Sequence, residues 1–287
     1  MHTELDQAYF ESLVDFQAAG ERVSVCLRSL TADSDLLRFM VRYASWNGSF
    51  SNGVSRLASE IGNCRDLFRE KGFPRAASDR SNYVASFIFD AARDEYDDHV
   101  LPMRDTHRCM AQAGLMSMAE FLQLGHAILD EEEPIDLVRL NDRVGRGYGG
   151  QALAMCGVIG CVFAGIGYHL GSELLADQEF SMIDQHLRSS RNDLVQHLMR
   201  STVKLAGGEH RCYAWVGVHS GHGGGVEADH FDLALRGVRA AFEFLVGDER
   251  VRKVATTAVS EGFKAFERDH QSFFAMSTLA TAGATPA

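Results

Sequence analysis

Residues 149–172 read GGQALAMCGVIGCVFAGIGYHLGS, a stretch that carries no formal charge and holds seven glycines. Its length and apolar character are similar to those of a membrane span. However, it contains Gln151 and His169, and no basic residue flanks its C-terminal side, where spans often carry one. We therefore interpret it as part of a buried central helix over about 148–187, whose small residues let neighbouring helices approach closely.

The rest of the chain shows apolar residues at helical spacing, whereas the alternation typical of strands is nearly absent. Capping residues divide it into segments. We expect a first helix after Thr3 and further helices over about 34–46, 79–99, 103–115, 117–129, 148–187, 190–205, 226–245 and 248–274. The sequence thus predicts an all-α fold with a single domain over residues 1–277 and a flexible C-terminal tail over 278–287.

Charge and cysteine usage exclude several classes of protein. The formal net charge of -11 argues against a nucleic-acid partner, because binding to phosphates needs clustered Lys and Arg. The six cysteines form no CxxC pair, so neither a zinc knuckle nor a disulfide framework is indicated. The N-terminus is acidic and unlike a secretory signal, which favours a cytoplasmic location without a membrane anchor. A homodimer is the favoured assembly, since dimers are common among helical bundles.

Several acids and histidines fall on the apolar faces of the expected helices. In the helix over about 79–99, apolar residues recur at helical spacing and the same face then reaches Glu95. The central helix places Glu173 on its apolar stripe in the same way. Near the C-terminus an ExxH motif puts an acid and a histidine on one face. The residues with this property are Glu95, His107, Glu173, Glu227 and His230.

Taken singly, each of these residues is more simply explained as a hydrogen-bonded core residue or as the partner of an arginine. Together they suggest a bound cation, because burying an unpaired carboxylate costs several kcal/mol. Carboxylate and imidazole ligands without thiolate suit iron or manganese better than structural zinc. Helical bundles build such sites from facing helices. We therefore predict that these five side chains are metal ligands.

Two further motifs contain residues that could bind a metal or a phosphate. A second ExxH occurs at Glu267 and His270, but its spacing leaves no room for the intervening carboxylate helix of a ferritin-like site, so we expect both residues on the surface of the last helix. The segment His-Ser-Gly-His-Gly-Gly-Gly over 219–225 favours a loop, because consecutive glycines disfavour helix. It completes neither a P-loop nor a GxSxG elbow. Whether His222 lies beside the metal stays open.

Four short segments occur in order between about residues 35 and 246. They are Ala-Arg-Asp-Glu95, Thr-His107 leading to Ala-Gly114-Leu, Gly167-Tyr-His-Leu-Gly-Ser-Glu173 followed by Phe180, and Glu227-Ala-Asp-His230. This order resembles the haem-oxygenase-like superfamily and, within it, the non-haem dimetal oxidases and oxygenases. The resemblance implies a haem-oxygenase-like helical bundle that binds one or two iron ions and uses dioxygen to oxidise a small amino-acid-like or fatty-acid-like substrate.

The chain departs from the pattern of that family in three places. Residues 41–50 lack the carboxylate that the first core helix usually supplies, and Glu60 is a distant substitute. Arg104 stands where an acid is common, and Gly223 stands where a histidine is usual, with His222 adjacent. The second metal position therefore stays open. Further substitutes for it are Asp229 and His99.

Two alternative functions use the same residues differently. A metal-free member of this fold would bind a small molecule or act as a cofactor-independent enzyme, and its inward acids would pair with Arg93, Arg104 or Arg108. A helical module that only binds other proteins would lack an enclosed pocket. In the iron-dependent enzyme, Tyr168 and Tyr213 are candidates for shaping the substrate pocket.

Overall fold

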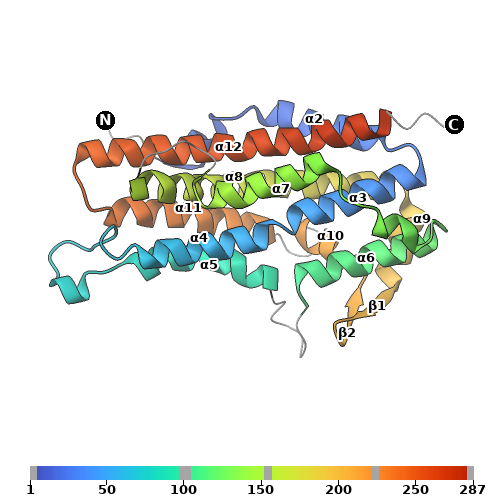
Figure 1. Ribbon diagram of the computed structural model, residues 1–287, viewed down its shortest axis with the longest axis horizontal. Coiled ribbons are helices and arrows are strands. Elements are labelled where there is room, and N and C mark those ends of the chain that lie inside the picture. Colours follow the sequence, from blue (N-terminus) through green and yellow to red (C-terminus); the bar gives the residue numbers. More distant parts are fainter. Residues whose placement is uncertain (1–4, 97–104, 152–156, 221–225, 283–287) are drawn as a thin grey trace.

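The computed structural model describes residues 5–96, 105–151, 157–220 and 226–282 (Figure 1). Most of these residues are helical, which confirms the predicted all-α class. The helices are α1 Gln7–Glu11, α2 Phe16–Ser29, α3 Asp33–Asn47, α4 Phe50–Asn63, η1 Arg75–Ala77, α5 Ser81–Tyr96, α6 His107–Phe121, η2 His126–Asp130, α7 Ile135–Tyr148, α8 Gly157–Ser190, α9 Asn192–Arg200, α10 Ala214–His219, α11 Val226–Phe244 and α12 Glu249–Ala282, of which η1 and η2 are short 3₁₀ helices. Strands β1 Thr202–Leu205 and β2 Gly208–Arg211 pair as an antiparallel hairpin.

The bundle is organised around the long helices α8 and α12, which run side by side (Figure 1). A Cβ atom on Gly167 of α8 would lie 1.9 Å from the carbonyl oxygen of Val259, and one on Gly262 of α12 would lie 2.0 Å from that of Ala164. No side chain fits at such distances, so the two backbones can touch only because both positions are glycine. The prediction that small residues of the central helix allow close approach is confirmed.

By length and composition, α8 is long and apolar enough to cross a membrane. An 18-residue window within it has a mean hydropathy of 1.4, and 78% of that window is buried inside the bundle. Helices α7, α11 and α12 all pack against α8. The prediction that this segment forms a buried central helix agrees with that burial.

Alanine at Gly167 should therefore destabilise the fold. The added methyl group would have to push α12 away from α8, and overpacking of this kind costs about 1–3 kcal/mol. Urea unfolding of Gly167→Ala measures that loss. Gly145→Ala in α7 is the matched control, because a Cβ there meets nothing within 4 Å and alanine raises helix propensity by up to about 1 kcal/mol. Equal stability of the two variants would contradict this account of the packing.

Among the longer observed helices, α4 and α7 are absent from the sequence prediction, as are the short helices η1 and α10. Glycine, serine and asparagine lower the helix propensity of α4, and two glycines near the end of α7 do the same there. Each helix nevertheless buries an apolar stripe, which includes Leu57 and Ile61 in α4 and Leu140 and Val144 in α7. Burial of these stripes outweighs the weak local propensity.

Several boundaries also differ. The central helix, predicted to begin at about residue 148, begins at Gly157, and Tyr148 is instead the last residue of α7. The helices predicted over 103–115 and 117–129 correspond to α6 followed by η2. The helix predicted over 190–205 ends at Arg200, and a hairpin follows, because Ala206 and Gly207 both take positive φ angles that suit a tight hairpin turn. The predicted tail begins inside α12, which extends to Ala282, and residues 283–287 lie outside the described part of the chain.

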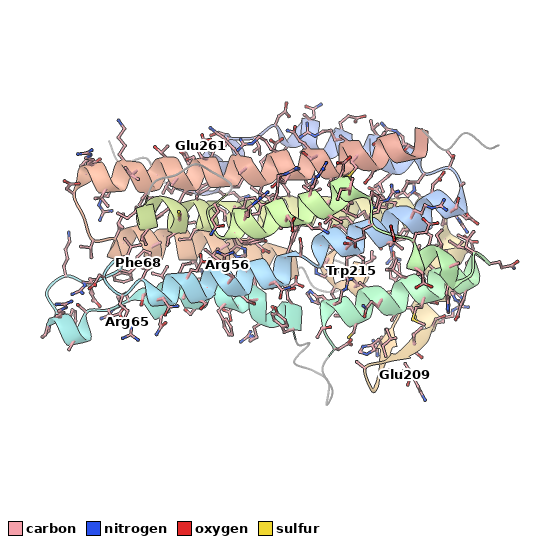
Figure 2. All side chains as sticks on the ribbon, in the orientation of Figure 1. Arg56, Arg65, Phe68, Glu209, Trp215 and Glu261 are labelled. Atoms are coloured by element: carbon pink, nitrogen blue, oxygen red, sulfur yellow. The ribbon has the colours of Figure 1, made fainter. Side chains whose placement is uncertain are left out.

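Helices α10 and α11 pack against α8, and α5 and α6 pack against α11 and α10 in turn, beside the polar residues of α8. Figure 2 places Trp215 of α10 among these helices, whereas Glu209 lies on the hairpin that projects from the bundle. The Trp215 ring lies 5.5 Å from the rings of both Tyr43 and Phe180. This aromatic cluster forms an apolar wall beside the polar residues of α5, α6 and α8.

Candidate metal centre

Acids and histidines from five helices converge in the interior of the bundle. Helix α5 carries two acids in its last turn, α6 begins with a histidine and α10 ends with one. Helices α8 and α11 pass beside them. The converging residues are Asp94 and Glu95 of α5, His107 of α6, His169 and Glu173 of α8, His219 of α10 and His230 of α11.

The first group of donors consists of Glu95, His107 and His219. Each offers one ligand atom, and these atoms lie within 4.8 Å of one another. The Nδ1 atom of His107 is 3.4 Å from Oε1 of Glu95, and the rings of His107 and His219 have centroids 4.5 Å apart. Burial disfavours the charged form of His107, but the Glu95 carboxylate outweighs this and raises the pKa of that imidazole.

The hydrogen bond of His219 determines which of its nitrogens can bind a metal. Nδ1 lies 2.6 Å from the carbonyl oxygen of Trp215, and because a carbonyl only accepts, Nδ1 must carry the proton and donate it. The lone pair of the neutral ring is therefore on Nε2. Burial, together with the nearby His107, holds the pKa of His219 well below its usual range. His219 is thus a neutral imidazole, which is the form that ligates metals.

The second group of donors consists of Glu173 and His230, with Asp94 behind them. Oε2 of Glu173 is 3.7 Å from Nδ1 of His230, and Nε2 of His230 lies 2.8 Å from Oδ2 of Asp94. If Nε2 donates its proton to the Asp94 carboxylate, Nδ1 presents its lone pair toward Glu173. A carboxylate that orients a histidine in this way is a common feature behind metal ligands.

Burial raises the pKa of Glu173 to about 7, an effect opposed by His230 and reinforced by the charges of Glu95 and Asp94. Oε1 of Glu173 also lies 3.2 Å from Nδ1 of His169. Burial lowers the pKa of His169 to about 3, so this imidazole is neutral and does not compensate the carboxylate. Glu173 is therefore a buried acid whose ionised form a nearby cation would stabilise.

A small cavity of about 20 Å³ lies where the two groups of donors meet. Its lining includes Glu95, Glu173, His219 and His230. A cavity of roughly 10–15 Å³ on this measure holds one water molecule, so the space fits a single small ion or water. Residues from both groups of donors thus line the same small cavity.

Four of the five predicted ligands are brought together: Glu95, His107, Glu173 and His230. Glu227 lies in α11, but its side chain is outside the described residues, as are those of Asp229 and Arg104. His99 and His222 are also outside them. Three residues of the cluster are missing from the sequence prediction, namely Asp94, His169 and His219.

Two of the three arginines that a metal-free site would require, Arg93 and Arg108, lie in the described part of the chain, and neither pairs with Glu95 or Glu173. Arg93 lies 3.5 Å from Asp90 and 3.8 Å from Asp94, and Arg108 donates a hydrogen bond to a backbone carbonyl. Within the described ranges, no arginine nitrogen lies within 4.0 Å of the carboxylate of Glu95 or Glu173. The inward acids are thus neighboured by histidines.

The two residues of the second ExxH motif differ in their exposure to solvent. His270 is 1% exposed, and its Nε2 lies 3.0 Å from Oε2 of Glu179, so the prediction of a surface histidine is wrong. The helical period of α12 turns this residue toward α8. Glu267, by contrast, is partly exposed and pairs with Arg22 at 2.8 Å. Neither residue lines the small cavity of the candidate metal centre.

The two tyrosines suggested for the pocket have other partners. Tyr168 donates to Asp269 at 2.9 Å and Tyr213 donates to Asp184 at 2.5 Å. Neither tyrosine lines the small cavity or the larger one described next. They therefore stabilise helix packing and do not form the walls of these cavities.

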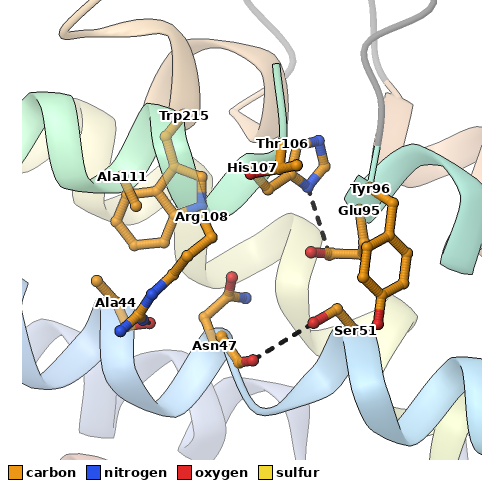
Figure 3. A pocket seen from close by; sticks show the side chains of 11 residues that line it. Ala44, Asn47, Ser51, Glu95, Tyr96, Thr106, His107, Arg108, Ala111 and Trp215 are labelled. Atoms are coloured by element: carbon orange, nitrogen blue, oxygen red, sulfur yellow. Dashed lines mark hydrogen bonds and ion pairs between the residues drawn. The ribbon is translucent and has the colours of Figure 1, made fainter. Parts of the chain in front are cut away.

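A larger cavity of about 140 Å³ adjoins the candidate centre on the other side of Glu95 and His107 (Figure 3). Its walls combine polar and apolar side chains from α3, α4, α5, α6 and α10. Because Glu95 lines both cavities, a molecule in the larger one would lie next to the donor cluster.

No family model, curated protein or solved structure matches this chain significantly. The case for a function therefore depends on the geometry described above.

Proposed function

We propose that this chain is a non-haem iron-dependent oxidase or oxygenase built on a haem-oxygenase-like bundle, acting on a small-molecule substrate with dioxygen. The observation that carries the proposal is the convergence of Glu95, Glu173, His219 and His230 around one small cavity, with His107 in contact with Glu95 and His219. These residues offer only carboxylate and imidazole donors, which suit iron.

The donor set fits a metal ion in its chemistry and its spacing. Ligand atoms bonded to one ion at ~2.0–2.2 Å lie at most ~4.4 Å apart, and the first group of donors lies within 4.8 Å, so small side-chain adjustments suffice. Nε2 of His169 has no hydrogen-bond partner among the described residues, and the Nδ1 atoms of His107 and His169 face the carboxylates of Glu95 and Glu173 at 3.4 and 3.2 Å without a well-aligned hydrogen bond. Unsatisfied buried polar atoms are expected at a site that binds an ion.

The residues divide into those that would hold iron and those that would orient the ligands. Glu95, His107 and His219 form one set of ligands, and Glu173 with His230 forms the other, so one or two ions can be bound. Asp94 and the carbonyl of Trp215 fix the rings of His230 and His219. When bound, ferrous iron supplies the electrons that reduce dioxygen.

The surrounding helices exclude water and place the substrate. His107, Glu173, His219 and His230 are each at most 8% exposed, so the reacting atoms would be shielded from bulk solvent, which protects reactive species from side reactions. The cavity of about 140 Å³ beside Glu95 provides room for the substrate next to the donors.

Iron content tests this proposal directly. Protein expressed with added ferrous iron and purified without oxygen should contain one or two iron ions per chain by elemental analysis. Exposure to oxygen should then change its near-ultraviolet absorption. Protein that retains no iron, and whose absorption oxygen leaves unchanged, would contradict the proposal and favour the metal-free alternative.

A further inference from the structure

The larger cavity has chemically different ends. Glu95 and His107 lie at one end, and the guanidinium of Arg108 lies at the other, as Figure 3 shows. His107 is 8% exposed, whereas Arg108 is exposed. The end with the arginine is therefore nearer to solvent, and the end with the metal donors is buried.

Local packing fixes the position of Arg108. Its Nη1 donates a 2.8 Å hydrogen bond to the carbonyl oxygen of Ala44, in the last turn of α3. That carbonyl is at the negative end of the helix dipole, which favours a cation there. Gly48 makes the contact possible, because a Cβ at that position would lie 2.7 Å from Nη1.

The guanidinium retains unused binding capacity. Arginine has five N–H donors in a planar fork that matches a carboxylate. The hydrogen bond described for Arg108, to the carbonyl oxygen of Ala44, uses one of them. In the ranges that the structure describes, no carboxylate lies within 4.0 Å of this guanidinium. The wall between the two ends includes the apolar side chains of Ala111 and Trp215. Asn47 also lines this part of the cavity (Figure 3), so a cation, a wall of mixed polarity and the end with Glu95 and His107 follow one another along it.

The volume of the cavity limits the length of its ligand. A protein cavity of about 150 Å³ holds benzene, and this one measures about 140 Å³. A ligand of roughly six to eight non-hydrogen atoms therefore fits. A medium-chain or long-chain fatty acid does not fit within this volume.

We propose that the cavity binds a short-chain carboxylate whose carboxyl group is held by Arg108 and whose carbon chain points toward Glu95 and His107. This inference rests on the proposed function for its chemistry, since the carbon that faces the metal donors would be the oxidised one. The binding itself requires no metal. Arg108 thus determines both the class of the substrate and its direction in the cavity.

Calorimetric titration of the metal-free protein with butanoate tests the inference. Arg108→Gln should weaken butanoate binding roughly 10- to 100-fold, as expected for loss of a charged hydrogen-bonded pair. Gly48→Ala should also weaken it, because the methyl group would lie 2.7 Å from Nη1 of Arg108 and 2.9 Å from the Ala44 carbonyl oxygen that holds the guanidinium, so that this contact must shift. Arg139→Gln, which removes an exposed arginine of α7 paired with Asp136, is the matched control and should bind as the wild type does.

Two further ligands test the direction of binding and the length limit. Succinate should bind more weakly than butanoate, because its second carboxylate would face Glu95, and dodecanoate should not bind. Equal binding of butanol and butanoate, unchanged binding by Arg108→Gln, or preferential binding of inorganic phosphate would each overturn the inference. The iron content of Arg108→Gln should equal that of the wild type, so failure of the metal centre and failure of this subsite are measured separately.

Discussion

The substitution His107→Ala should abolish most of the iron binding of the protein. His107 lies between two other donors of the first group, with Glu95 at 3.4 Å and the ring of His219 at a centroid distance of 4.5 Å. Even residues that only orient metal ligands change affinity 10- to 100-fold when mutated, so loss of a direct ligand should exceed about 100-fold. Elemental analysis of His107→Ala, prepared with ferrous iron alongside the wild type, measures the loss.

A second histidine provides the control for this substitution. His197 of α9 is also partly buried, stacks on Phe121 and lies 3.1 Å from Ser117, but it lines neither cavity of the candidate centre. His197→Ala should keep the iron of the wild type although it also loses an imidazole. Equal iron content in His107→Ala and His197→Ala would show that the metal does not bind at this cluster.

Helical periodicity was sufficient to place much of this site. Glu95, Glu173 and His230 occur in phase with the apolar residues of long helices, and the period of 3.6 residues determines which face they share. Since those faces must be buried, the acids had to enter the core. The same reasoning extends to His169, which lies one turn before Glu173 and could have been found from that stripe.

Asp94 and His219 could not be found from periodicity. His219 ends the six-residue helix α10, which is too short for a periodic signal and precedes a run of glycines that favours a loop. Asp94 is adjacent to Glu95, so helical geometry turns it to a different side. Only the packing of α11 against α5 brings His230 within 2.8 Å of it.

The substrate end of the cavity depends even more on tertiary structure. Arg108 directly follows His107 in the chain, and in a helix their side chains diverge by about 100°. They line one cavity because α3 ends beside α6 and its Ala44 carbonyl holds the guanidinium. Contacts between the end of one helix and the side of another leave no pattern in the sequence of either.

Glutamine in place of Glu173 should make the metal-free protein more stable at alkaline pH. The pKa of Glu173 is raised from 4.5 to about 7 in the folded chain, chiefly by burial. Below pH 4.5 the acid is protonated in both the folded and unfolded states, so its ionisation does not change the free energy of unfolding. As the pH rises above 4.5, the carboxyl group ionises in the unfolded state but stays protonated in the folded state until the pH passes about 7, so the free energy of unfolding falls between these two pH values. The resulting loss of stability approaches about 3 kcal/mol at pH 8.

Urea unfolding with a chelator present should therefore show Glu173→Gln close to the wild type at pH 5 and more stable by up to about 3 kcal/mol at pH 8. Ferrous iron should reverse this order, because the metal stabilises the folded wild type and the variant lacks one ligand. Glu267→Gln on α12, where the acid pairs with Arg22, should gain no stability at either pH. If Glu173→Gln instead destabilised the metal-free protein at pH 8, Glu173 would serve a structural hydrogen-bonding role. If Glu173 lowers the stability of the metal-free protein and raises that of the iron-bound protein, its role is to bind the metal.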